Sequence, residues 1–191
     1  MILGKLKKLR GEGHIGGNEE QKQLLTKLTK GKSVYLETGF NIGHSAFHVL
    51  SNDPDIVVYS FDIGRVNKRS TTDNDSFTAY EILKSEYGDR LHVTWGNSVE
   101  TLPACSPLSA DVLFIDGCHS YKVAKADIEN MKKHSKADGV VLMDDLYREH
   151  LPRSRDGTTR AWEESIESKI ISQTAIYRQN RRSFATGVYC K

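Results

Sequence analysis

Short apolar runs alternate with amphipathic stretches along most of the chain. Five runs have the length and composition of buried strands: 34–38, 56–62, 91–96, 111–116 and 139–145. Three stretches between them place apolar side chains at helical spacing: the residues after Gly43, residues 77–87 and residues 121–134. Runs that are apolar throughout and are separated by helices are typical of a parallel sheet covered on both faces. The pattern therefore predicts an α/β fold.

The chain begins and ends with further elements. Asn18, followed by Gln21 at the third helical position, is a capping pattern that predicts a helix over 18–30. We expect residues 1–17 to form a mobile N-terminal arm. Near the other end, TRAWEESIES (159–168) predicts a helix, and the stretch through FATGVYC predicts one or two closing strands antiparallel to the others. At 191 residues, the chain fits a single domain over 1–191.

Composition narrows the class of protein. Hydrophobic residues make up 38% of the chain and charged residues 27%, the balance of a soluble globular protein. No apolar run is long enough to cross a bilayer, and the opening MILGKLKKLR lacks the apolar run and cleavage site of a secretory signal. We expect a cytoplasmic protein that makes no membrane contact.

Charge and cysteine content argue against three further classes of protein. The 27 Lys and Arg residues nearly balance 25 Asp and Glu residues, and a net charge of +2 is too small to indicate a nucleic-acid groove. Cys105, Cys118 and Cys190 are odd in number and have no paired spacing, which indicates neither a disulfide framework nor a structural zinc site. We expect reduced thiols and no nucleic-acid partner.

Candidate ligand-binding residues stand at the carboxyl ends of the first two predicted strands, where open α/β sheets bind ligands. Gly39 and Gly43 let the backbone turn tightly and approach a ligand closely. Their G-x-x-x-G spacing is not the G-x-G-x-x-G fingerprint of a dinucleotide site, which argues against a nicotinamide dehydrogenase. Asp62 ends the second strand, where a carboxylate can accept hydrogen bonds from ribose hydroxyls. Taken singly, these residues could equally form an ordinary turn and a solvated strand end.

Three carboxylates, those of Asp116, Asp144 and Asp145, are expected at the ends of the fourth and fifth strands. Carboxylates at such short range raise one another's pKa unless a cation neutralises their charge. Their hard oxygen ligands suit Mg²⁺ or a similar ion. His119 follows Asp116 by three positions and lies within reach of what the metal holds. A turn with solvated side chains is the alternative for each residue alone, and convergence of all four favours a site.

The order of these residues resembles the class I methyltransferase family over nearly the whole chain: an acid two positions before Gly39, then Asp62, then Gly96-Asn97-Ser98. The resemblance implies a Rossmann-like sheet of seven mainly parallel strands with an antiparallel C-terminal strand, helices on both faces, and S-adenosylmethionine as cofactor. It implies that the glycines line the methionine part, that Asp62 holds the ribose, and that Asn97-Ser98 meets the adenine, although many members carry Asp at position 97. Glu37 is expected to orient the loop or the amino end of the cofactor. The implied cofactor-binding set is Glu37, Gly39, Asn41, Gly43, Ser45, Asp62, Asn97, Ser98, Asp116 and Gly117.

The motif D-G-C-H-S-Y with the later Asp144-Asp145 pair resembles the metal-dependent O-methyltransferases, both the catechol type and, more closely, a sugar-modifying group. The resemblance implies that Asp116, Asp144 and Asp145 bind Mg²⁺ and that His119 is the general base. Catechol-type enzymes usually carry Asp-Asn at the pair, so this chain is nearer the sugar-modifying pattern. Cys118 is expected to be a bystander, because thiols prefer softer metals. The implied reaction is O-methylation of a small hydroxylated acceptor such as a sugar, a polyol or a catechol-like molecule.

The acceptor is the least defined part of the reaction. The segment 147–160 carries four arginines and His150, and arginine forks suit a phosphate, carboxylate or uronate group, so an anionic acceptor is one hypothesis. A second subunit could complete the pocket, which leaves a homo-oligomer open. Two other functions remain: a metal-independent or non-catalytic protein that binds S-adenosylmethionine, and a metal-dependent phosphoesterase. The arginines are Arg148, Arg153, Arg155 and Arg160.

Overall fold

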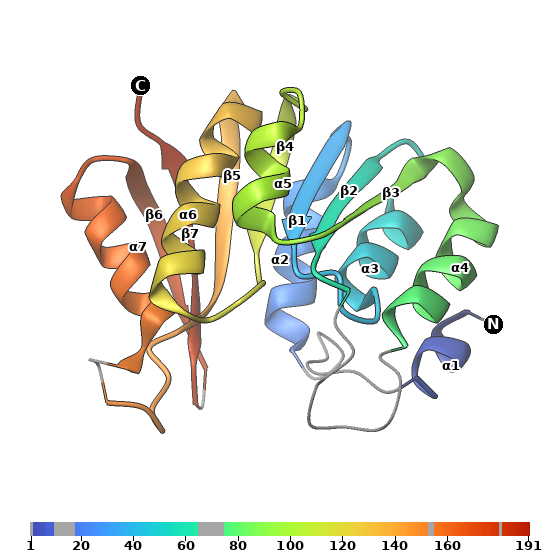
Figure 1. Cartoon of the computed structure of the whole chain (residues 1–191), viewed down its shortest axis with the longest axis horizontal. Helices are drawn as coiled ribbons and strands as arrows, with labels where there is room; N and C mark the ends of the chain where they lie inside the picture. The colour runs from blue at the N-terminus through green and yellow to red at the C-terminus, as the bar shows by residue number, and fades with distance from the viewer. Residues whose placement is uncertain (1, 10–17, 65–74, 153–154, 180) are drawn as a thin grey trace.

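A computed structural model describes residues 2–9, 18–64, 75–152, 155–179 and 181–191 of the chain. Within these residues, seven strands form one sheet in the order β3-β2-β1-β4-β5-β7-β6 (Figure 1). β7 runs antiparallel to both of its neighbours, and the other pairs are parallel. The strands are β1 (Val34–Thr38), β2 (Val57–Asp62), β3 (Leu91–Trp95), β4 (Ala110–Ile115), β5 (Ser135–Leu146), β6 (Ile171–Arg178) and β7 (Ser183–Tyr189). The predicted seven-stranded, mainly parallel sheet with an antiparallel C-terminal strand is confirmed.

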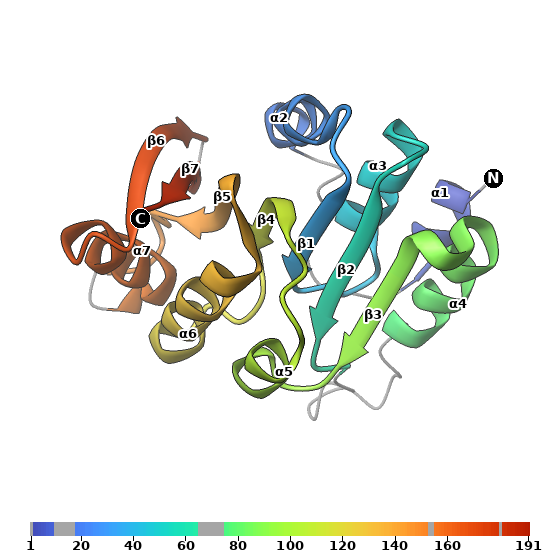
Figure 2. The ribbon, with the colours of Figure 1, turned by 90° about the horizontal axis from the view of Figure 1, so that it is seen from above.

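Helices cover both faces of the sheet (Figure 2). One apolar cluster joins the first four helices to one face, and a second joins the last three to the other. On β1, Tyr35 belongs to the first cluster and Leu36 to the second, as expected for successive residues of a strand covered on both sides. The helices are α1 (Ile2–Leu6), α2 (Glu19–Thr29), α3 (His44–Asn52), α4 (Ser76–Tyr87), α5 (Ser98–Ala104), α6 (Tyr121–Met131) and α7 (Gly157–Glu167), with short 3-10 turns η2 (Gly88–Arg90) and η3 (Lys132–His134).

The N-terminal helix has the cap that the sequence predicts. The Asn18 side chain accepts a hydrogen bond from the backbone N–H of Gln21 at 3.0 Å, and Gly31 after the helix has φ of +68°. Within the expected N-terminal arm, residues 2–6 form α1. Leu6 is fully buried in the first apolar cluster, and Ile2 and Leu9 pack against that cluster. The rest of the expected arm, 10–17, lies outside the described residues.

The strand order places a switch point between β1 and β4. After β1 the chain adds strands toward β3, and after β3 it returns to β4 and builds outward in the other direction. Parallel pairing brings the carboxyl ends of β1, β2, β4 and β5 to one edge, with Thr38 opposite both Phe61 and Ile115. Open α/β sheets bind ligands at such a switch point. In the described part of the chain, none of the helices combines the length and apolarity that a membrane span requires.

Candidate functional site

The turn after β1 packs tightly against the end of β4. Gly39 has φ of +92°, and a Cβ there would lie 2.2 Å from the backbone oxygen of Asp116. Asn41 and Gly43 also have positive φ, at 49° and 69°, and Gly43 caps the N-terminus of α3. A left-handed backbone of this kind favours glycine. The two glycines predicted from the sequence therefore make the turn itself.

Glu37 is fully buried beneath that turn. Its carboxylate accepts hydrogen bonds from the hydroxyls of Tyr35 at 2.9 Å, Ser45 at 2.7 Å and Ser60 at 2.6 Å. Burial raises the pKa of Glu37 to about 7, and the three hydroxyl hydrogen bonds oppose that rise. These contacts tie β1 to β2 and to the first turn of α3. Of the two roles expected for Glu37, they support the one that orients the loop.

Asp62 joins the same turn from β2. One carboxylate oxygen accepts the backbone N–H of Asn41 at 2.8 Å, and the other accepts that of Gly64 at 2.7 Å. A carboxylate oxygen has two lone pairs, so each oxygen retains one that can accept a hydroxyl. Ile63 follows with a side chain 47% exposed. Asp62 thus lies beside the glycine turn, as the sequence predicted, with acceptor capacity to spare.

Asn97 and Ser98 begin α5 beyond the end of β3. The Asn97 side chain caps this helix by accepting the N–H of Val99 at 3.3 Å, and the Gly96 N–H donates to the Asp62 carbonyl at 2.8 Å. Ser98 interacts with the carboxyl of Asp127, whose pKa is raised to about 6 by burial, with Ser98 and Thr38 opposing the rise. Asn97 is exposed, so its amide is the polar group that this turn offers to a ligand.

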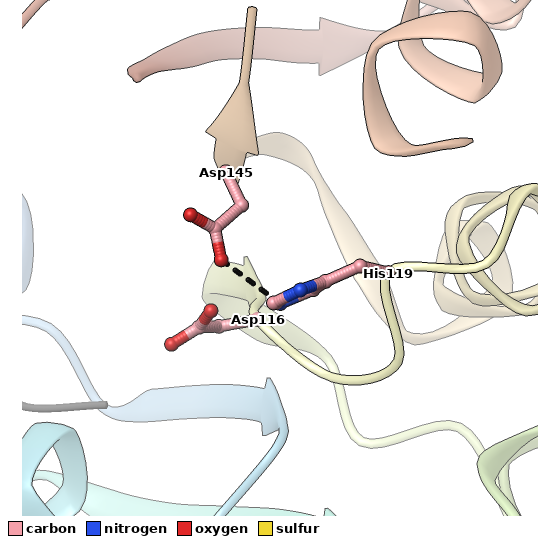
Figure 3. A group of neighbouring side chains, drawn as sticks. All are labelled: Asp116, His119 and Asp145. Atoms are coloured by element: carbon pink, nitrogen blue, oxygen red, sulfur yellow. Dashed lines mark ion pairs between the residues drawn. The ribbon is translucent and has the colours of Figure 1, made fainter. Parts of the chain in front are cut away.

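Asp116, His119 and Asp145 come together at the ends of β4 and β5 (Figure 3). Each offers one ligand atom, and these atoms lie within 4.8 Å of one another. His119 Nε2 is 2.9 Å from an Asp145 carboxylate oxygen, the contact dashed in Figure 3. Two carboxylate oxygens and an imidazole nitrogen at this spacing can hold one small divalent ion.

Asp144 lies next to this group but is held differently. It is 4% exposed, and its carboxylate accepts the backbone N–H of Asp145 at 2.8 Å. Burial, together with the charge of neighbouring aspartates, raises the pKa of both Asp116 and Asp144. Burial acts in the same sense on Asp145, but hydrogen bonds and attraction from His119 and Arg182 outweigh it and lower the pKa of Asp145. The grouped ligand atoms thus include His119 in place of Asp144, whereas the sequence predicted the three aspartates as ligands; that ligand set stays a prediction.

Two arginines that the sequence did not single out as partners of this cluster contact it. Arg182 Nη1 donates to Asp145 at 2.6 Å, and Arg148 Nη1 lies 3.3 Å from His119 Nδ1. Arg148 is itself paired with the buried Asp156 at 3.2 Å. The sequence placed Arg148 among the residues expected to bind the acceptor, but in the structure its side chain contacts His119. Arg182 comes from the turn before β7, and nothing in its local sequence signals the contact.

A cavity of about 160 Å³ joins the glycine turn to the acid cluster. It is also lined by Gln21 of α2, a residue that the sequence signals only as part of a helix cap. The predicted residues that line it are Gly39, Asn41, Ser45, Asp116, Gly117, His119, Asp144 and Asp145. Five other predicted residues are not among its lining residues: Glu37, Gly43, Asp62, Asn97 and Ser98. One hollow therefore connects the predicted cofactor turn with the predicted metal residues.

Of the other basic residues of segment 147–160, those that the structure describes do not line this cavity. Arg160 stacks over the ring of Tyr121, 4.5 Å from its centroid, and the Tyr121 hydroxyl donates to Glu164. Arg155 and His150 are exposed, and Arg153 lies outside the described residues. Tyr121 of the D-G-C-H-S-Y motif thus helps to join α6 to α7.

Solved structures match this architecture. A putative caffeoyl-CoA O-methyltransferase from Staphylococcus aureus superposes with a TM-score of 0.69 at 18% identity, covering 98% of this chain and 88% of that chain. The O-methyltransferase TomG from Streptomyces achromogenes, in complex with SAM, has a TM-score of 0.67 at 17% identity, with coverage of 90% and 80%. CalS11, a TDP-rhamnose 3'-O-methyltransferase of calicheamicin biosynthesis, has a TM-score of 0.63 at 14% identity, with coverage of 88% and 78%.

The strand order, the reversed β7 and these superpositions define a class I methyltransferase fold. A family model described as a methyltransferase domain matches residues 36–146, from β1 to the end of β5 and more than half of the chain. The chain belongs to this methyltransferase-domain family. No curated protein matches it by sequence.

Proposed function

We propose that this methyltransferase moves the methyl group of S-adenosylmethionine to a hydroxyl oxygen of a small acceptor. The observation that carries the proposal is a cavity that joins the glycine turn after β1 to Asp116, His119 and Asp145. The fold is shared with TomG, which was solved with SAM, and with CalS11, a sugar O-methyltransferase. A sugar, polyol or catechol-like acceptor fits the same chemistry.

For the cofactor, the chain offers complementary groups at both ends. The free lone pairs of Asp62 can accept the two ribose hydroxyls, and the exposed face of Ile63 can cover the adenine ring. Asn97 can hydrogen-bond the edge of the base. The methionine part then occupies the cavity over Gly39, with Asn41 and Ser45 beside it.

The acid cluster fits a Mg²⁺-class ion because its carboxylates are hard donors whose mutual repulsion a cation relieves. Asp116 and Asp145 are the first candidates to hold it, and Asp144 lies next to them along β5. When bound, the ion supplies a positive charge that lowers the pKa of the acceptor hydroxyl. The protein's own side chains then have to place the hydroxyl and take its proton.

His119 is the proposed base. In the neutral tautomer that donates from Nε2 to Asp145, the lone pair lies on Nδ1, which the acceptor hydroxyl reaches by displacing Arg148 Nη1, 3.3 Å away, and Asp145 stabilises the imidazolium once Nδ1 is protonated. The acceptor oxygen forms a bond to the methyl carbon as the S–C bond breaks, and S-adenosylhomocysteine leaves with the electron pair. The hydroxyl proton goes to His119. Apart from this transfer, the protein aligns two molecules and excludes water.

The acceptor itself remains a proposal drawn from the chemistry of the cluster. Two of the arginines expected to bind an anionic acceptor already have other partners, which argues against such an acceptor. Arg148 pairs with Asp156, and Arg160 stacks over the Tyr121 ring. We propose a small molecule rather than a nucleic acid, with a second subunit as one means of closing the pocket.

Calorimetry with S-adenosylmethionine tests the function. We expect the wild-type chain and Asp144→Asn to bind the cofactor alike, with methyl transfer lost in the variant and in EDTA. The matched control, Asp138→Asn, makes the same charge change at an exposed position near the start of β5 and should keep full turnover. Failure to bind S-adenosylmethionine would rule out the proposal. Cofactor binding without turnover would instead favour a non-catalytic protein, and turnover that ignores Asp144, EDTA and His119 would favour a metal-independent enzyme.

A further inference from the structure

Arg182 brings a positive charge into the acid cluster. Its guanidinium donates to one carboxylate oxygen of Asp145 at 2.6 Å, and it is attracted by Asp144 and Asp116 as well. The side chain is 35% exposed and lines the same cavity as the three aspartates. Arginine is always charged at neutral pH, so this charge is permanent. It lies where a metal would relieve the same repulsion.

The turn that carries Arg182 is fixed at several points. The backbone N–H of Gln179 donates to the Arg182 carbonyl at 2.9 Å, and that of Glu149 donates to the Arg181 carbonyl at 3.0 Å. The side chains of Asn18 and Gln179 hydrogen-bond each other, which ties the turn to α2. The guanidinium therefore reaches the cluster from an anchored backbone.

Both carboxylate oxygens of Asp145 already have a partner. Arg182 occupies one, and His119 occupies the other at 2.9 Å. A divalent ion at Asp116 and Asp145 needs an oxygen of Asp145, and it repels a guanidinium held within hydrogen-bond distance of that oxygen. The ion and Arg182 thus compete for the same negative charge.

We propose that Arg182 is a resident counter-cation that competes with the divalent ion for Asp145. It stabilises the carboxylates when the ion is absent and weakens the ion's binding. The inference rests on the metal site of the proposed function, and it concerns the affinity of that site rather than the identity of the acceptor.

Titration with Mn²⁺ tests the competition directly. Free Mn²⁺ is followed by electron paramagnetic resonance in wild type, Arg182→Gln and Arg181→Gln, without cofactor or acceptor. Arg182→Gln should bind Mn²⁺ about tenfold more tightly, because a like charge next to the ion is gone. Arg181→Gln removes the same charge one residue away, at an exposed side chain, and should match wild type.

The melting temperature gives a second measurement. Without Mn²⁺, Arg182→Gln should melt below Arg181→Gln, since its aspartates lose their counter-charge. With saturating Mn²⁺ it should gain more than wild type, because tighter binding to the folded state stabilises it more. Arg182→Lys retains the charge, so its Mn²⁺ affinity should remain nearer to that of wild type even if the glutamine variant folds poorly.

The outcomes separate this inference from the proposed function. If wild type binds Mn²⁺ and Arg182→Gln binds it equally or less tightly, the competition is wrong and the metal site stands. If neither binds Mn²⁺, both the competition and the metal role are wrong, and calorimetry with S-adenosylmethionine decides separately whether the methyltransferase assignment survives.

Discussion

Asp62 and Asp145 both stand near the carboxyl ends of strands at one edge of the sheet, but their carboxylates have different partners. Asp62 accepts two backbone N–H groups from the turns that begin at Gly39 and at its own strand end. Asp145 contacts two side chains, those of His119 and Arg182, which come from other parts of the chain. One carboxylate is held by neutral donors and the other by ionisable side chains.

The partners of the two carboxylates indicate what each region can bind. The two partners of Asp62 are neutral backbone donors, and each oxygen keeps a lone pair that suits neutral hydroxyls such as those of a ribose. The charged partners of Asp145 offset the mutual repulsion of the carboxylates in the acid cluster. A site of this kind suits the exchange of one cation for another. We call the first region, which contains Gly39, Asp62 and Asn97, the cradle, and its contacts are fixed. The second region is a site at which two cations compete.

The largest expected effect comes from the residue where the two regions touch. In Gly39→Ala, the new Cβ would lie 2.2 Å from the Asp116 backbone oxygen, at a φ of +92° that alanine rarely adopts. We expect the free energy of unfolding to fall by about 4 kcal/mol from the combined overlap and strain. Urea denaturation followed by circular dichroism measures it.

Gly31→Ala is the matched control. Its φ is +68°, but nothing lies within 4 Å of the added Cβ, so only the backbone strain remains, about 1 kcal/mol. Equal losses in the two variants would mean that the contact between the glycine turn and β4 contributes nothing, and the two regions would then be independent.

The second prediction concerns Glu37, the buried acid beneath the cradle. Its pKa is about 7 in the folded chain against an ordinary value of 4.5. Below pH 4.5 the carboxyl is neutral in both states, and between 4.5 and 7 the unfolded chain releases the proton while the folded chain keeps it. Folding stability from this group therefore falls as pH rises through that window, by about 3 kcal/mol in full.

Glu37→Gln removes this titration, so chemical denaturation at pH 4.5 and pH 8 isolates it. The stability of the variant relative to wild type should improve by about 3 kcal/mol from the lower to the higher pH. The change excludes other titrating groups, because both proteins contain them. A difference that is constant with pH would show that Glu37 is ionised throughout and that its three hydroxyl donors outweigh its burial.

Local sequence signals were enough for the cradle. Gly39, Asp62 and Asn97 form contacts within their own turns or with the adjacent strand, and the alternation of apolar runs with amphipathic stretches predicted that the strands are parallel. The same reasoning placed Asp116 and Asp145 at one edge. The structure brings Asp116, His119 and Asp145 together there, with Asp144 next to Asp145.

The partners of the acid cluster could not be predicted in this way. Arg182 contacts Asp145 across 37 positions, and Asn18 contacts Gln179 across 161, so the pairing depends on how β7 and α2 pack. α5 was not identified, because it has only seven residues and contains Pro103. The buried Leu6 of α1 was missed for a similar reason, since its partners lie in distant helices.

The same substitution, Asp to Asn, is expected to have different effects in the two regions. Asp62→Asn should weaken S-adenosylmethionine binding by about thirtyfold and leave turnover at saturating cofactor nearly unchanged, because a ribose contact is lost. Asp145→Asn should leave cofactor affinity within about threefold and lower turnover by about 100-fold, because the histidine loses its charged partner. Calorimetry and steady-state kinetics measure the two quantities. If both variants lost affinity and turnover together, the division of labour would be wrong.

The smallest effect is expected at the cap of α5, which belongs to the cradle. Asn97→Ala removes the acceptor for the Val99 N–H and should lower the free energy of unfolding by about 1 kcal/mol, measured by chemical denaturation. Asn97→Asp keeps the cap and places a negative charge at a helix N-terminus, so it should be at least as stable as wild type. Because Asn97 is exposed and also faces the proposed adenine site, the alanine variant should bind S-adenosylmethionine more weakly than the aspartate variant. Equal cofactor affinity in the two variants would confine Asn97 to capping.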